Sequence, residues 1–596
     1  MLLTELLHKL RHGFCFDTET SGKKPGDALV IHSLSLVGIS FAVTPWEAYY
    51  LPIPEEPKAA ASIVQQLAVI FSDPSIPKTG HNLKYDINVL RRYGVHVQGA
   101  LFDTMIAHYL YNPAGKHGLK VLSKDLLHYQ QIEISHLLGK GKYQRSMCSI
   151  PVREAAEYAC EDADQTLQLK NILEPMLAQK KLTQLFHLIE CPLIYVLADM
   201  EYTGIRLDPD ALRKVSDQIN TELATLQQQL DILTEVKDFN PKSPSQLREL
   251  LFIKLGLEST TKTPTGNKST GKKVLQKLKH PIVSLILRYK ELSSLKSHFM
   301  ETLIAKIHPV TGRVHTSFRQ ATVVTGRLSS SNPNLQNIPK TPGLGQEIRK
   351  AFVPRDDDHV LVAADYGQIE LRVMAHFSQD PALINAFNNG VDIHLATASK
   401  IFNIRPEQID AEGTQRKIAK TVNFGLNYMM SANSLAERIS EATGEEVDVA
   451  KAKVYMSKYF EEFSRVERYQ KDAYFFALEH GYSQTIFGRR RYVSGIDSAI
   501  PSKRNAAKRI AVNTPIQGSA ADIIKKAMLV LHQELIRLGL RSKMVLQIHD
   551  ELVVDVPRSE LDQVVPLIRD VMENVVKLDV PLVVDIGVGN NWLEAH

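Results

Sequence analysis

The sequence VAADYGQIELR at residues 362–372 decides the fold, because it places a carboxylate at the end of a buried strand. A lone charge at such a position is costly unless it coordinates a cation or pairs with a base. A second acidic sequence, QIHDELVV at residues 547–554, carries Asp550 in a hairpin-like turn between two β-rich segments. We therefore expect Asp365 and Asp550 to lie together in the folded protein.

Two aspartates brought together from distant segments predict a divalent metal site. Mg²⁺ prefers oxygen ligands and usually takes one or two carboxylates together with substrate phosphates. The pattern therefore indicates two-metal phosphoryl transfer on a nucleotide. For each segment alone, the alternative is that Asp365 caps a turn and that Asp550 and Glu551 belong to an ordinary solvated hairpin.

Length and composition indicate a multidomain globular protein, and the expected α/β fold class follows from the resemblance given below. A chain of 596 residues is too long for one hydrophobic core and predicts roughly three to five lobes. The net charge of +5 permits a polyanionic partner. Four cysteines without CxxC spacing argue against a zinc module or a disulfide framework and favour a reducing compartment. No stretch of ~18 uncharged apolar residues predicts a membrane span, so we expect no membrane partner.

Three pairs of polar side chains recur with regular spacing in the first part of the chain. The pairs are Asp17/Glu19, Asn82/Asp86 and Tyr158/Asp162. The first pair alternates along an apolar strand and therefore points to one face. The other two pairs are spaced by four residues, which places each on one face of a helical segment. Four acids repel one another unless metal is bound, so the cluster fits two cations that hold a water, oriented by Tyr158, and a scissile phosphate.

Each pair taken alone is explained more often by a solvated helix face than by catalysis. In this order and spacing the pairs resemble the DEDDy type of 3′–5′ exonuclease, all of whose acids are present. The resemblance implies an intact proofreading site on a ribonuclease H-like domain. We interpret the neighbouring His81 as a hydrogen-bond donor at a helix start, with a substrate contact as the alternative.

Two later stretches are expected to contact nucleic acid without reading its sequence. Residues 259–273 are rich in turn formers and lysine without balancing acids, which suits phosphate contact. A solvated loop between helices is the alternative. Residues 325–339, TGRLSSSNPNLQNIP, carry an arginine and several amides, which are donors suited to a minor groove. A copying enzyme needs such neutral contacts, because its specificity comes from the template base.

Arg416, Lys420, Phe424 and Tyr428 recur at intervals of four and predict one stripe along a helix. With a rise of ~1.5 Å per residue the stripe spans roughly 18 Å, about the length of a nucleoside triphosphate and its pairing partner. The two cations would neutralise the triphosphate, with Lys420 assisting the leaving pyrophosphate, and the two aromatic rings would stack near sugar and base. An amphipathic surface helix is the alternative.

Over essentially its full length, the chain resembles the bacterial family A DNA polymerases. The matching sequences are TGRLSSSNPNLQNIP at 325–339, DYGQIELR at 365–372, RKIAKTVNFGLNY at 416–428, NTPIQGSAADIIKKAM at 513–528, QIHDELV at 547–553 and NNWLEAH at 590–596. The resemblance implies a right-hand arrangement of palm, fingers and thumb behind the exonuclease lobe.

The resemblance also implies roles for single residues. Asp365 and Asp550 would hold two Mg²⁺ ions, which Mn²⁺ could replace, and Glu551 would support them; the exonuclease site would hold two more. Glu370 would crowd the sugar 2′ position, and Phe424 in place of Tyr resembles members that discriminate against dideoxynucleotides. Further contacts are implied with the nucleotide for Gln368 and His394, and with DNA for Asn82, Arg327, Arg509, Asn513, Gln517 and His549.

Domain order and partners follow from the same resemblance. We expect the exonuclease domain at 1–190 and the polymerase domain at 191–596, divided into a thumb at about 191–310, a palm at about 311–380 and 510–596, and fingers at about 381–509. Primer–template DNA and deoxynucleoside triphosphates are the expected partners of a monomer. A bacterial cytoplasmic, nucleoid-associated location is implied, with organelle or phage origin left open. The chain starts at the exonuclease lobe without a 5′-nuclease domain, as a trimmed or a naturally short form.

The chain departs from the family pattern at a few positions. Gly367 stands where the family usually has Ser, and four further substitutions follow the nucleotide stripe, at Asn427, Met429, Asn433 and Ser434. None removes a proposed catalytic group. Met429 replaces a glycine that lets the helix bend or the template approach, so template-base gating and closure of the fingers are expected to differ from those of relatives.

Three other functions were weighed against DNA synthesis. A single-subunit RNA polymerase would share the palm acids and the nucleotide helix, but the exonuclease strand and the bulky Glu370 argue against it. A DNA-binding factor built on a decayed polymerase would have lost carboxylates, and every expected acid is present. A nuclease with a degenerate second lobe fails for the same reason.

Overall fold

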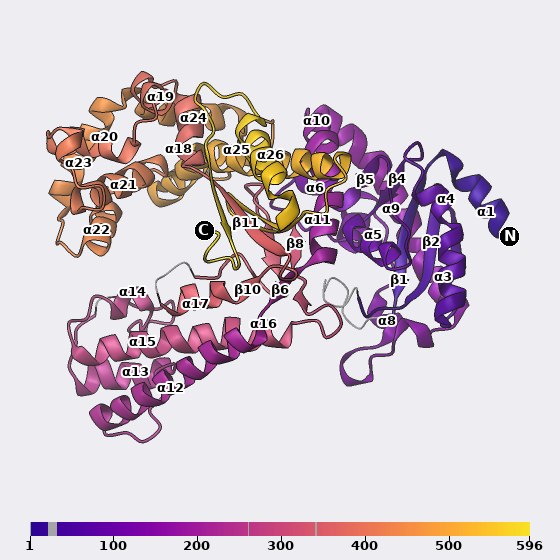
Figure 1. The fold of residues 1–596 in the computed structure, drawn as a ribbon, viewed down its shortest axis with the longest axis horizontal. Helices are drawn as coiled ribbons and strands as arrows, with labels where there is room; N and C mark the ends of the chain where they lie inside the picture. Colours follow the sequence, from indigo (N-terminus) through magenta and orange to yellow (C-terminus); the bar gives the residue numbers. More distant parts are fainter. Residues whose placement is uncertain (1, 22–31, 260, 340–342) are drawn as a thin grey trace.

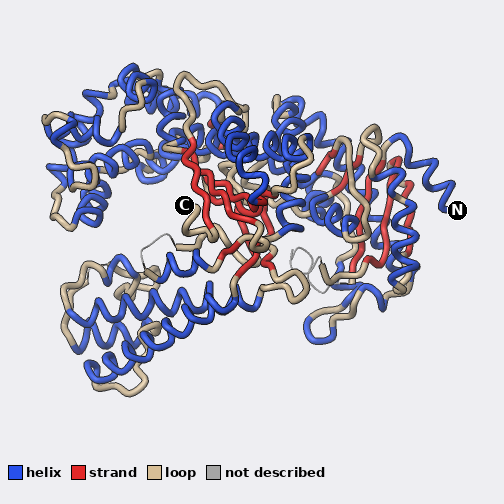
Figure 2. Tube along the Cα trace, viewed as in Figure 1, coloured by secondary structure: helices blue, strands red, loops and turns tan. Residues whose placement is uncertain are grey.

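The computed structural model describes residues 2–21, 32–259, 261–339 and 343–596. Figure 1 shows an N-terminal α/β lobe at one end of an elongated molecule and two mainly helical lobes at the other. An antiparallel sheet lies between these parts, and Figure 2 shows its strands together with those of the N-terminal lobe. The multidomain architecture expected from the length, and the α/β fold class implied by the resemblance, are thus confirmed.

The N-terminal lobe is built on a five-stranded sheet with the strand order β3-β2-β1-β4-β5. Its strands are β1 (Phe14–Thr20), β2 (Leu36–Thr44), β3 (Glu47–Pro52), β4 (Lys78–Gly80) and β5 (Leu101–Asp103). β1 runs antiparallel to β2 and parallel to β4. The helices are α1 (Leu3–Lys9), α3 (Pro57–Gln66), α4 (Ala68–Phe71), α5 (Leu83–Arg91), α6 (Thr104–Tyr111), α7 (Leu119–Leu126), α8 (Ile134–Leu138) and α9 (Val152–Gln179). Edge-to-face contacts of Phe14, Phe16 and Phe71 fill the core beneath β1.

The central sheet has the order β14-β15-β11-β16, with all neighbours antiparallel. Its strands are β11 (His359–Tyr366), β14 (Lys543–Ile548), β15 (Glu551–Pro557) and β16 (Val584–Gly589). β11 is buried from His359 to Ala364, as its apolar sequence predicts. β14 and β15 form the predicted hairpin, and the turn between them consists of His549 and Asp550.

One helical lobe follows the N-terminal lobe in the sequence. It contains α12 (Pro209–Thr234), α13 (Pro244–Arg248), α14 (Lys272–Leu275), α15 (Pro281–Leu295) and α16 (Glu301–Ala305). Helical turns continue from α13 to Lys254. Within the expected basic loop, Lys262 and Lys268 form an antiparallel bridge, and Thr260 lies outside the described residues.

The second helical lobe follows β11 and ends in a helix of 37 residues. Its elements are α18 (Ile369–Ser378), α19 (Pro381–Asn388), α20 (Ile393–Phe402), α21 (Thr414–Asn427), α22 (Ala432–Thr443), α23 (Val449–Glu462), α24 (Ser464–His480), β12 (Tyr482–Gln484), β13 (Arg490–Tyr492) and α25 (Pro501–Arg537). α25 returns the chain to the central sheet, beside α26 (Leu561–Asn574).

Small elements connect the lobes. They are α10 (Thr183–Leu185), α11 (Cys191–Thr203), β6 (Ile205–Leu207), β7 (Arg313–Val314), β8 (Ser317–Arg319), β9 (Ser329–Ser331), α17 (Leu344–Lys350) and β10 (Phe352–Val353). Between Cys191 and Leu230 the chain forms α11, the short strand β6 and the greater part of α12. Gly204 ends α11 with a φ of +62°, and a Cβ there would lie 2.7 Å from Nδ1 of His315, so this turn needs glycine. α11 packs against both α5 and α25 and therefore joins the lobes.

All four cysteines are free thiols, as their spacing predicts. None of the helices in the described ranges combines the length and the apolar character that a membrane crossing requires.

Candidate active sites

The N-terminal lobe gathers three carboxylates at one point. β1 supplies Asp17 and Glu19, and α9 supplies Asp162. One oxygen from each lies within 4.8 Å of the others, and among the described residues this is the group of acids that is close enough to hold a metal ion. Buried, hard oxygen ligands at this spacing fit a divalent cation. The predicted cluster of β1 and α9 is thereby found in the structure.

The second predicted pair, Asn82 and Asp86, is split. Asp86 lies on α5, where its Oδ1 accepts hydrogen bonds from the Thr18 amide at 3.1 Å and the Thr18 hydroxyl at 2.5 Å. This holds Asp86 beside the cluster rather than in the group of three. Asn82 precedes α5 with a φ of +62°, so it does not share a helix face with Asp86 as expected. The four-residue spacing misled because the helix starts one residue after Asn82.

The cluster is electrostatically frustrated. Burial, followed by repulsion from Asp162 and Asp86, raises the pKa of Glu19 to about 8. Burial raises the pKa of Asp86 to about 7 despite its bonds from Thr18, and that of Asp162 to about 7 despite nearby Lys120. The pKa of Asp17 is also raised, by burial and then by Asp86. A cation that restored the ionised forms would relieve this repulsion.

Tyr158 stands next to Asp162 on α9, as predicted. Burial and then the Asp162 carboxylate raise the pKa of Tyr158, so the phenol keeps its proton and can donate a hydrogen bond. Two neighbours were not anticipated from the sequence. Gln131 donates to Asp162 Oδ1 at 2.7 Å, and Lys120 Nζ lies 4.9 Å from the Tyr158 ring centre. Both come from segments without a recognisable motif, so no signal in one sequence identifies them.

His81 is part of the structural framework of this lobe. Its Nδ1 lies 2.9 Å from the Thr104 hydroxyl, and burial lowers its pKa to about 3. A neutral, buried ring bonded to a neighbouring helix agrees with the structural interpretation, although the partner is Thr104 rather than its own helix start.

The central sheet brings the second set of acids together. Asp365 lies opposite Glu551 in the register of β11 and β15, and the Tyr366 amide donates to the Asp550 carbonyl at 3.2 Å. The segments that carry Asp365 and Asp550 are thus adjacent, as predicted. In the described ranges, Asp365, Asp550 and Glu551 do not form a metal-sized group of three like the N-terminal acids.

Glu551, which is not part of a metal-sized group of acids, is bonded to a buried tryptophan. The indole Nε1 of Trp592 donates to Glu551 Oε1 at 2.7 Å, and the Arg349 guanidinium lies 3.9 Å from the Trp592 ring centre. Burial lowers the pKa of Arg349, opposed by Glu551 and Asp365. Trp592 was noted only as part of a terminal motif, and the position of Arg349 was not anticipated. This arrangement fits a supporting role for Glu551.

The predicted nucleotide stripe lies on α21. Lys420, Phe424 and Tyr428 line one hollow beside the helix. Tyr428 follows the last helical residue, Asn427, so the stripe continues just beyond the helix end. Arg416 is engaged elsewhere: its Nε and Nη2 donate to Asp392 Oδ2 at 3.0 and 2.8 Å. Three of the four predicted residues therefore share one surface, and the fourth, Arg416, is paired within the protein.

His394 lies behind the aromatic part of the stripe. Its ring centre is 5.7 Å from that of Phe424, and its Nδ1 is 2.8 Å from the Asn423 amide nitrogen. Burial lowers the pKa of His394 to about 4, so the ring is neutral at pH 7. The structure therefore places His394 beside the stripe, where its ring bonds to the Asn423 side chain. Sequence reasoning did not single out Asn423.

Five of the six predicted DNA-contacting residues lie on α25 or in a depression that α25 helps to line. α25 carries Arg509, Asn513 and Gln517 at four-residue spacing, which places them along one side of that helix. Arg327 and His549 line one small depression together with Lys525 of α25 and Gln547 of β14.

Arg327 and the first turn of α18 are joined by an ion pair. Arg327 Nη2 donates to Glu370 Oε1 at 2.6 Å. Burial raises the pKa of Glu370, opposed by Arg327. Gln368 precedes α18 with a φ of +57°, between Asp365 and Glu370. The residues expected at the primer terminus and at the nucleotide sugar therefore contact each other in this structure.

Comparison with known proteins adds independent findings. A family model described as DNA polymerase family A matches residues 209–594, and one described as 3′–5′ exonuclease matches residues 2–178. The chain is 41% identical to DNA polymerase I of Chloroflexus aurantiacus over 99% of its own length and 62% of the relative. It is 40% identical to DNA polymerase I of Pseudomonas aeruginosa over 98% and 63%. The chain thus spans about three fifths of these curated relatives.

A solved structure resembles the whole chain. The POL domain of Pol1 from M. smegmatis, in complex with DNA primer-template and dNTP, superposes with a TM-score of 0.86 at 33% identity. The match covers 100% of this chain and 97% of that one.

Proposed function

Because the chain belongs to DNA polymerase family A and carries a 3′–5′ exonuclease domain, we propose that it extends DNA primers on a template and removes nucleotides from primer 3′ ends. The observation that carries the proposal is the presence of two separate carboxylate sites in one chain. One is the cluster of Asp17, Glu19 and Asp162, and the other is the strand end where Asp365 meets the Asp550 turn.

In the polymerase site, Asp365 and Asp550 would hold two Mg²⁺ ions, because the strand ends present hard oxygen donors. Bound Mg²⁺ would lower the pKa of the primer 3′-hydroxyl and stabilise charge on pyrophosphate. Lys420 would neutralise the triphosphate, and Phe424 and Tyr428 would border the sugar and base. Glu370 would exclude a ribose 2′-hydroxyl by its bulk.

DNA would enter past the residues that line the strand ends. Arg327 and Gln517 would donate to minor-groove acceptors near the primer terminus, where acceptors occur at every base pair. His549 would lie next to the terminal nucleotide, and Arg509 and Asn513 would follow the duplex along α25. The related Pol1 domain with primer-template and dNTP supports these partners.

In the exonuclease site, Asp17, Glu19, Asp86 and Asp162 would hold two Mg²⁺ ions. Bound metal would activate a water for attack on the scissile phosphate. Tyr158 would orient that water through its phenolic hydrogen, and Asn82 would contact the single strand.

The domain assignment is part of the proposal. The exonuclease domain would occupy 1–190, the thumb the lobe of α12 to α16, the fingers the lobe of α19 to α24, and the palm the central sheet. We propose that the protein acts as a monomer on DNA in the bacterial cytoplasm, at the nucleoid. The bacterial relatives support this setting.

The test is a labelled primer–template incubated with Mg²⁺, with and without the four deoxynucleoside triphosphates. Extension with nucleotides and shortening without them are the expected results. Shortening alone would favour a nuclease with a degenerate second lobe. Equal use of ribonucleotides would instead favour an RNA polymerase.

A further inference from the structure

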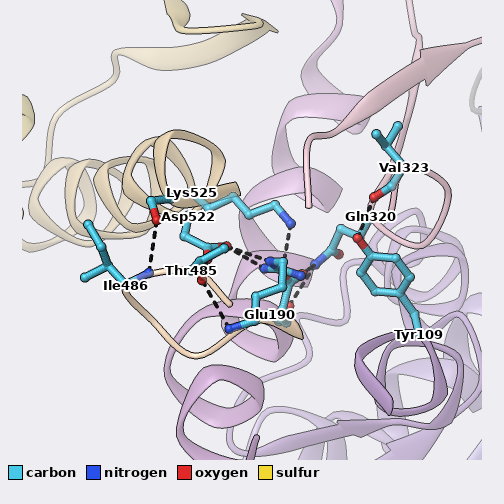
Figure 3. A network of polar contacts seen from close by, with 10 residues as sticks. Tyr109, Glu190, Gln320, Val323, Thr485, Ile486, Asp522 and Lys525 are labelled. Atoms are coloured by element: carbon cyan, nitrogen blue, oxygen red, sulfur yellow. Dashed lines mark hydrogen bonds and ion pairs between the residues drawn. The ribbon is translucent and has the colours of Figure 1, made fainter. Parts of the chain in front are cut away.

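Four buried charges join the N-terminal lobe to α25 and to the second helical lobe. Glu190 ends the helical turn Phe186–Glu190, Arg489 precedes β13, and Asp522 and Lys525 lie on α25. Their side chains are between 0 and 2% exposed. Figure 3 shows this group, which we name the interlobe cluster, together with the polar residues around it.

Arg489 is the centre of the interlobe cluster. Its Nε and Nη2 donate to Asp522 Oδ1 at 2.8 and 2.7 Å, and Nη2 also donates to Glu190. Lys525 Nζ donates to the same Glu190 oxygen at 2.7 Å. The Thr485 hydroxyl donates to Asp522 Oδ2 at 2.7 Å and accepts from the Arg489 amide at 3.1 Å. Every member therefore bonds at least one other member.

The formal charges of the interlobe cluster balance, with two acids and two bases, and Glu190 stays ionised. Burial alone would raise the pKa of Glu190, but Lys525 and Arg489 outweigh it and lower the pKa to about 2. Replacing a buried ion network by apolar residues of similar volume is often neutral or stabilising, so stability alone does not account for this arrangement. The planar, forked guanidinium of Arg489 instead fixes the geometry of the cluster, because it sets both the direction and the distance of its carboxylate partners.

The loop that carries Arg327 rests on this cluster. Gly326 has a φ of +89°, and a Cβ there would lie only 2.5 Å from Arg489 Nε. At the start of the loop, Gln320 Nε2 donates to the carbonyl and the carboxylate of Glu190 at 2.9 and 2.7 Å. The backbone next to Arg327 is thus in direct contact with the Arg489 side chain.

The same loop is also bound from the N-terminal lobe and from α25. The Tyr109 hydroxyl of α6 donates to the Val323 carbonyl at 2.7 Å, and the Gly326 amide donates to that carbonyl at 3.0 Å. On α25, a Cβ at Gly518 would lie 3.1 Å from the Thr325 carbonyl oxygen. Gly518 follows Gln517, so this close approach fixes the spacing between the Arg327 loop and the second expected minor-groove donor.

We propose that Arg489 is a positioning residue for Arg327 and that the Tyr109 hydroxyl makes the exonuclease lobe part of the same support. The inference rests on the proposed function, because it concerns the contact of Arg327 with the primer terminus. A side chain must be held within ~0.5 Å of its working position to act, and a buried fork behind its backbone provides that constraint. Loss of the fork would let the loop shift while the fold persists.

The test compares two primers that differ in one acceptor. One ends in guanine and the other in 3-deazaguanine, which lacks the N3 minor-groove acceptor. All proteins carry Asp17→Ala so that primers are not degraded. For the protein that keeps Arg489, kcat/KM should be about 10- to 100-fold lower on the 3-deaza primer than on the guanine primer, which is the effect of losing one charge-assisted hydrogen bond. On the guanine primer, kcat/KM of Arg489→Lys should be lower than that of the wild type by a similar factor. Changing its primer from guanine to 3-deazaguanine should then lower its kcat/KM by less than about 3-fold more.

Arg491→Lys, in the same hairpin but outside the interlobe cluster, is the matched control and should behave like the wild type. Degradation of single-stranded DNA by the same variants with Asp17 intact reports that the fold survives. If Arg489→Lys fails that assay, Tyr109→Phe replaces it, since this change removes only a hydroxyl. On the guanine primer, Tyr109→Phe should lower kcat/KM relative to the wild type by a smaller factor than Arg489→Lys. On the 3-deaza primer, it should differ little from the wild type.

Full sensitivity to 3-deazaguanine in Arg489→Lys or its Tyr109→Phe replacement would overturn the inference, as would no sensitivity in the wild type. Failure of the wild type to extend any primer would instead overturn the proposed function.

Discussion

The two carboxylate sites of this chain differ in how far they are assembled before any substrate arrives. In the N-terminal site, Asp17, Glu19 and Asp162 already stand within 4.8 Å of one another, and burial and repulsion raise their pKa values. In the strand-end site, one of the acids is instead bonded within the protein. Glu551 accepts a bond from Trp592, and the difference extends to the surrounding cations.

Those cations are paired within the protein. Arg416 is bonded to Asp392 and Arg327 to Glu370, at 2.8 and 2.6 Å. A substrate must therefore replace existing bonds in the second site, whereas a metal ion relieves repulsion in the first. Under the proposed function, the need to displace these internal partners would favour substrates that supply equivalent bonds, and would so add to specificity in the second site.

The largest expected effect separates the two sites. Asp550→Ala should lower primer extension more than about 10³-fold and leave degradation of single-stranded DNA unchanged, because only one site loses a metal ligand. Asp17→Ala should do the reverse. Both rates are measured on sizing gels with one labelled strand. Loss of both activities from either single change would show that the sites are not independent.

A second substitution separates nucleotide binding from DNA binding at the strand-end site. Lys420→Ala should lower single-nucleotide incorporation about 100-fold, because its cation meets the triphosphate, while primer–template affinity stays within about 2-fold. Lys453→Ala on the exposed face of α23 is the control and should change neither. Equal losses in incorporation and in DNA affinity would assign Lys420 to DNA rather than to the nucleotide.

A pH series tests the frustration of the N-terminal site. With folded-state pKa values of about 8 for Glu19 and about 7 for Asp86 and Asp162, the folded state binds more protons than the unfolded state, whose acids titrate near ~4. In chelator, stability should therefore fall as pH rises from about 4 to 8, by several degrees in Tm.

Thermal unfolding in EDTA and in Mg²⁺ measures this effect. Mg²⁺ should restore Tm at pH 8 and change little at pH 5, where the acids keep their protons. Glu19→Gln, which cannot ionise, should show a shallower slope in EDTA. A Tm that rises between pH 5 and pH 8 without metal would contradict the raised pKa values.

The smallest expected effect concerns the end of the nucleotide helix. Met429 has a φ of +52°, and the Met430 amide donates to the Gly425 carbonyl, a helix ending that favours glycine at the position of Met429. Met429→Gly should stabilise the protein by about 1 kcal/mol, since a non-glycine residue in this region costs about 1–2 kcal/mol. Denaturant unfolding measures the change, and Met430→Gly, which is not in that conformation, should be destabilising. Destabilisation by Met429→Gly would mean that its side-chain packing outweighs the strain.

How much the sequence could predict depended on whether a residue's partners were local. Asp17 and Glu19 followed from alternation along a strand, and Arg416 to Tyr428 from a period of four. The partners that define each environment come from distant segments: Gln131 for Asp162, Asp392 for Arg416 and Trp592 for Glu551. Periodicity carries no information about such contacts.

The domain boundary at residue 190 stays a prediction. Next to it, α11 packs against both α5 and α25, and Glu190 bonds to Arg489 and Lys525, some 300 positions later, which are contacts that local sequence patterns do not indicate. The four-residue spacing of Asn82 and Asp86 failed for a similar reason, since the left-handed turn at Asn82 is set by the fold around it.

The position of Glu190 limits how modular this protein can be. A cut after residue 190 would excise the carboxylate that Arg489 and Lys525 share, and leave two cations in the interior to divide Asp522 between them. Any shortened descendant, natural or designed, must therefore keep the turn Phe186–Glu190 or supply a new counter-ion at that point. Under the proposed domain assignment, the polymerase domain therefore needs a residue that lies within the exonuclease domain.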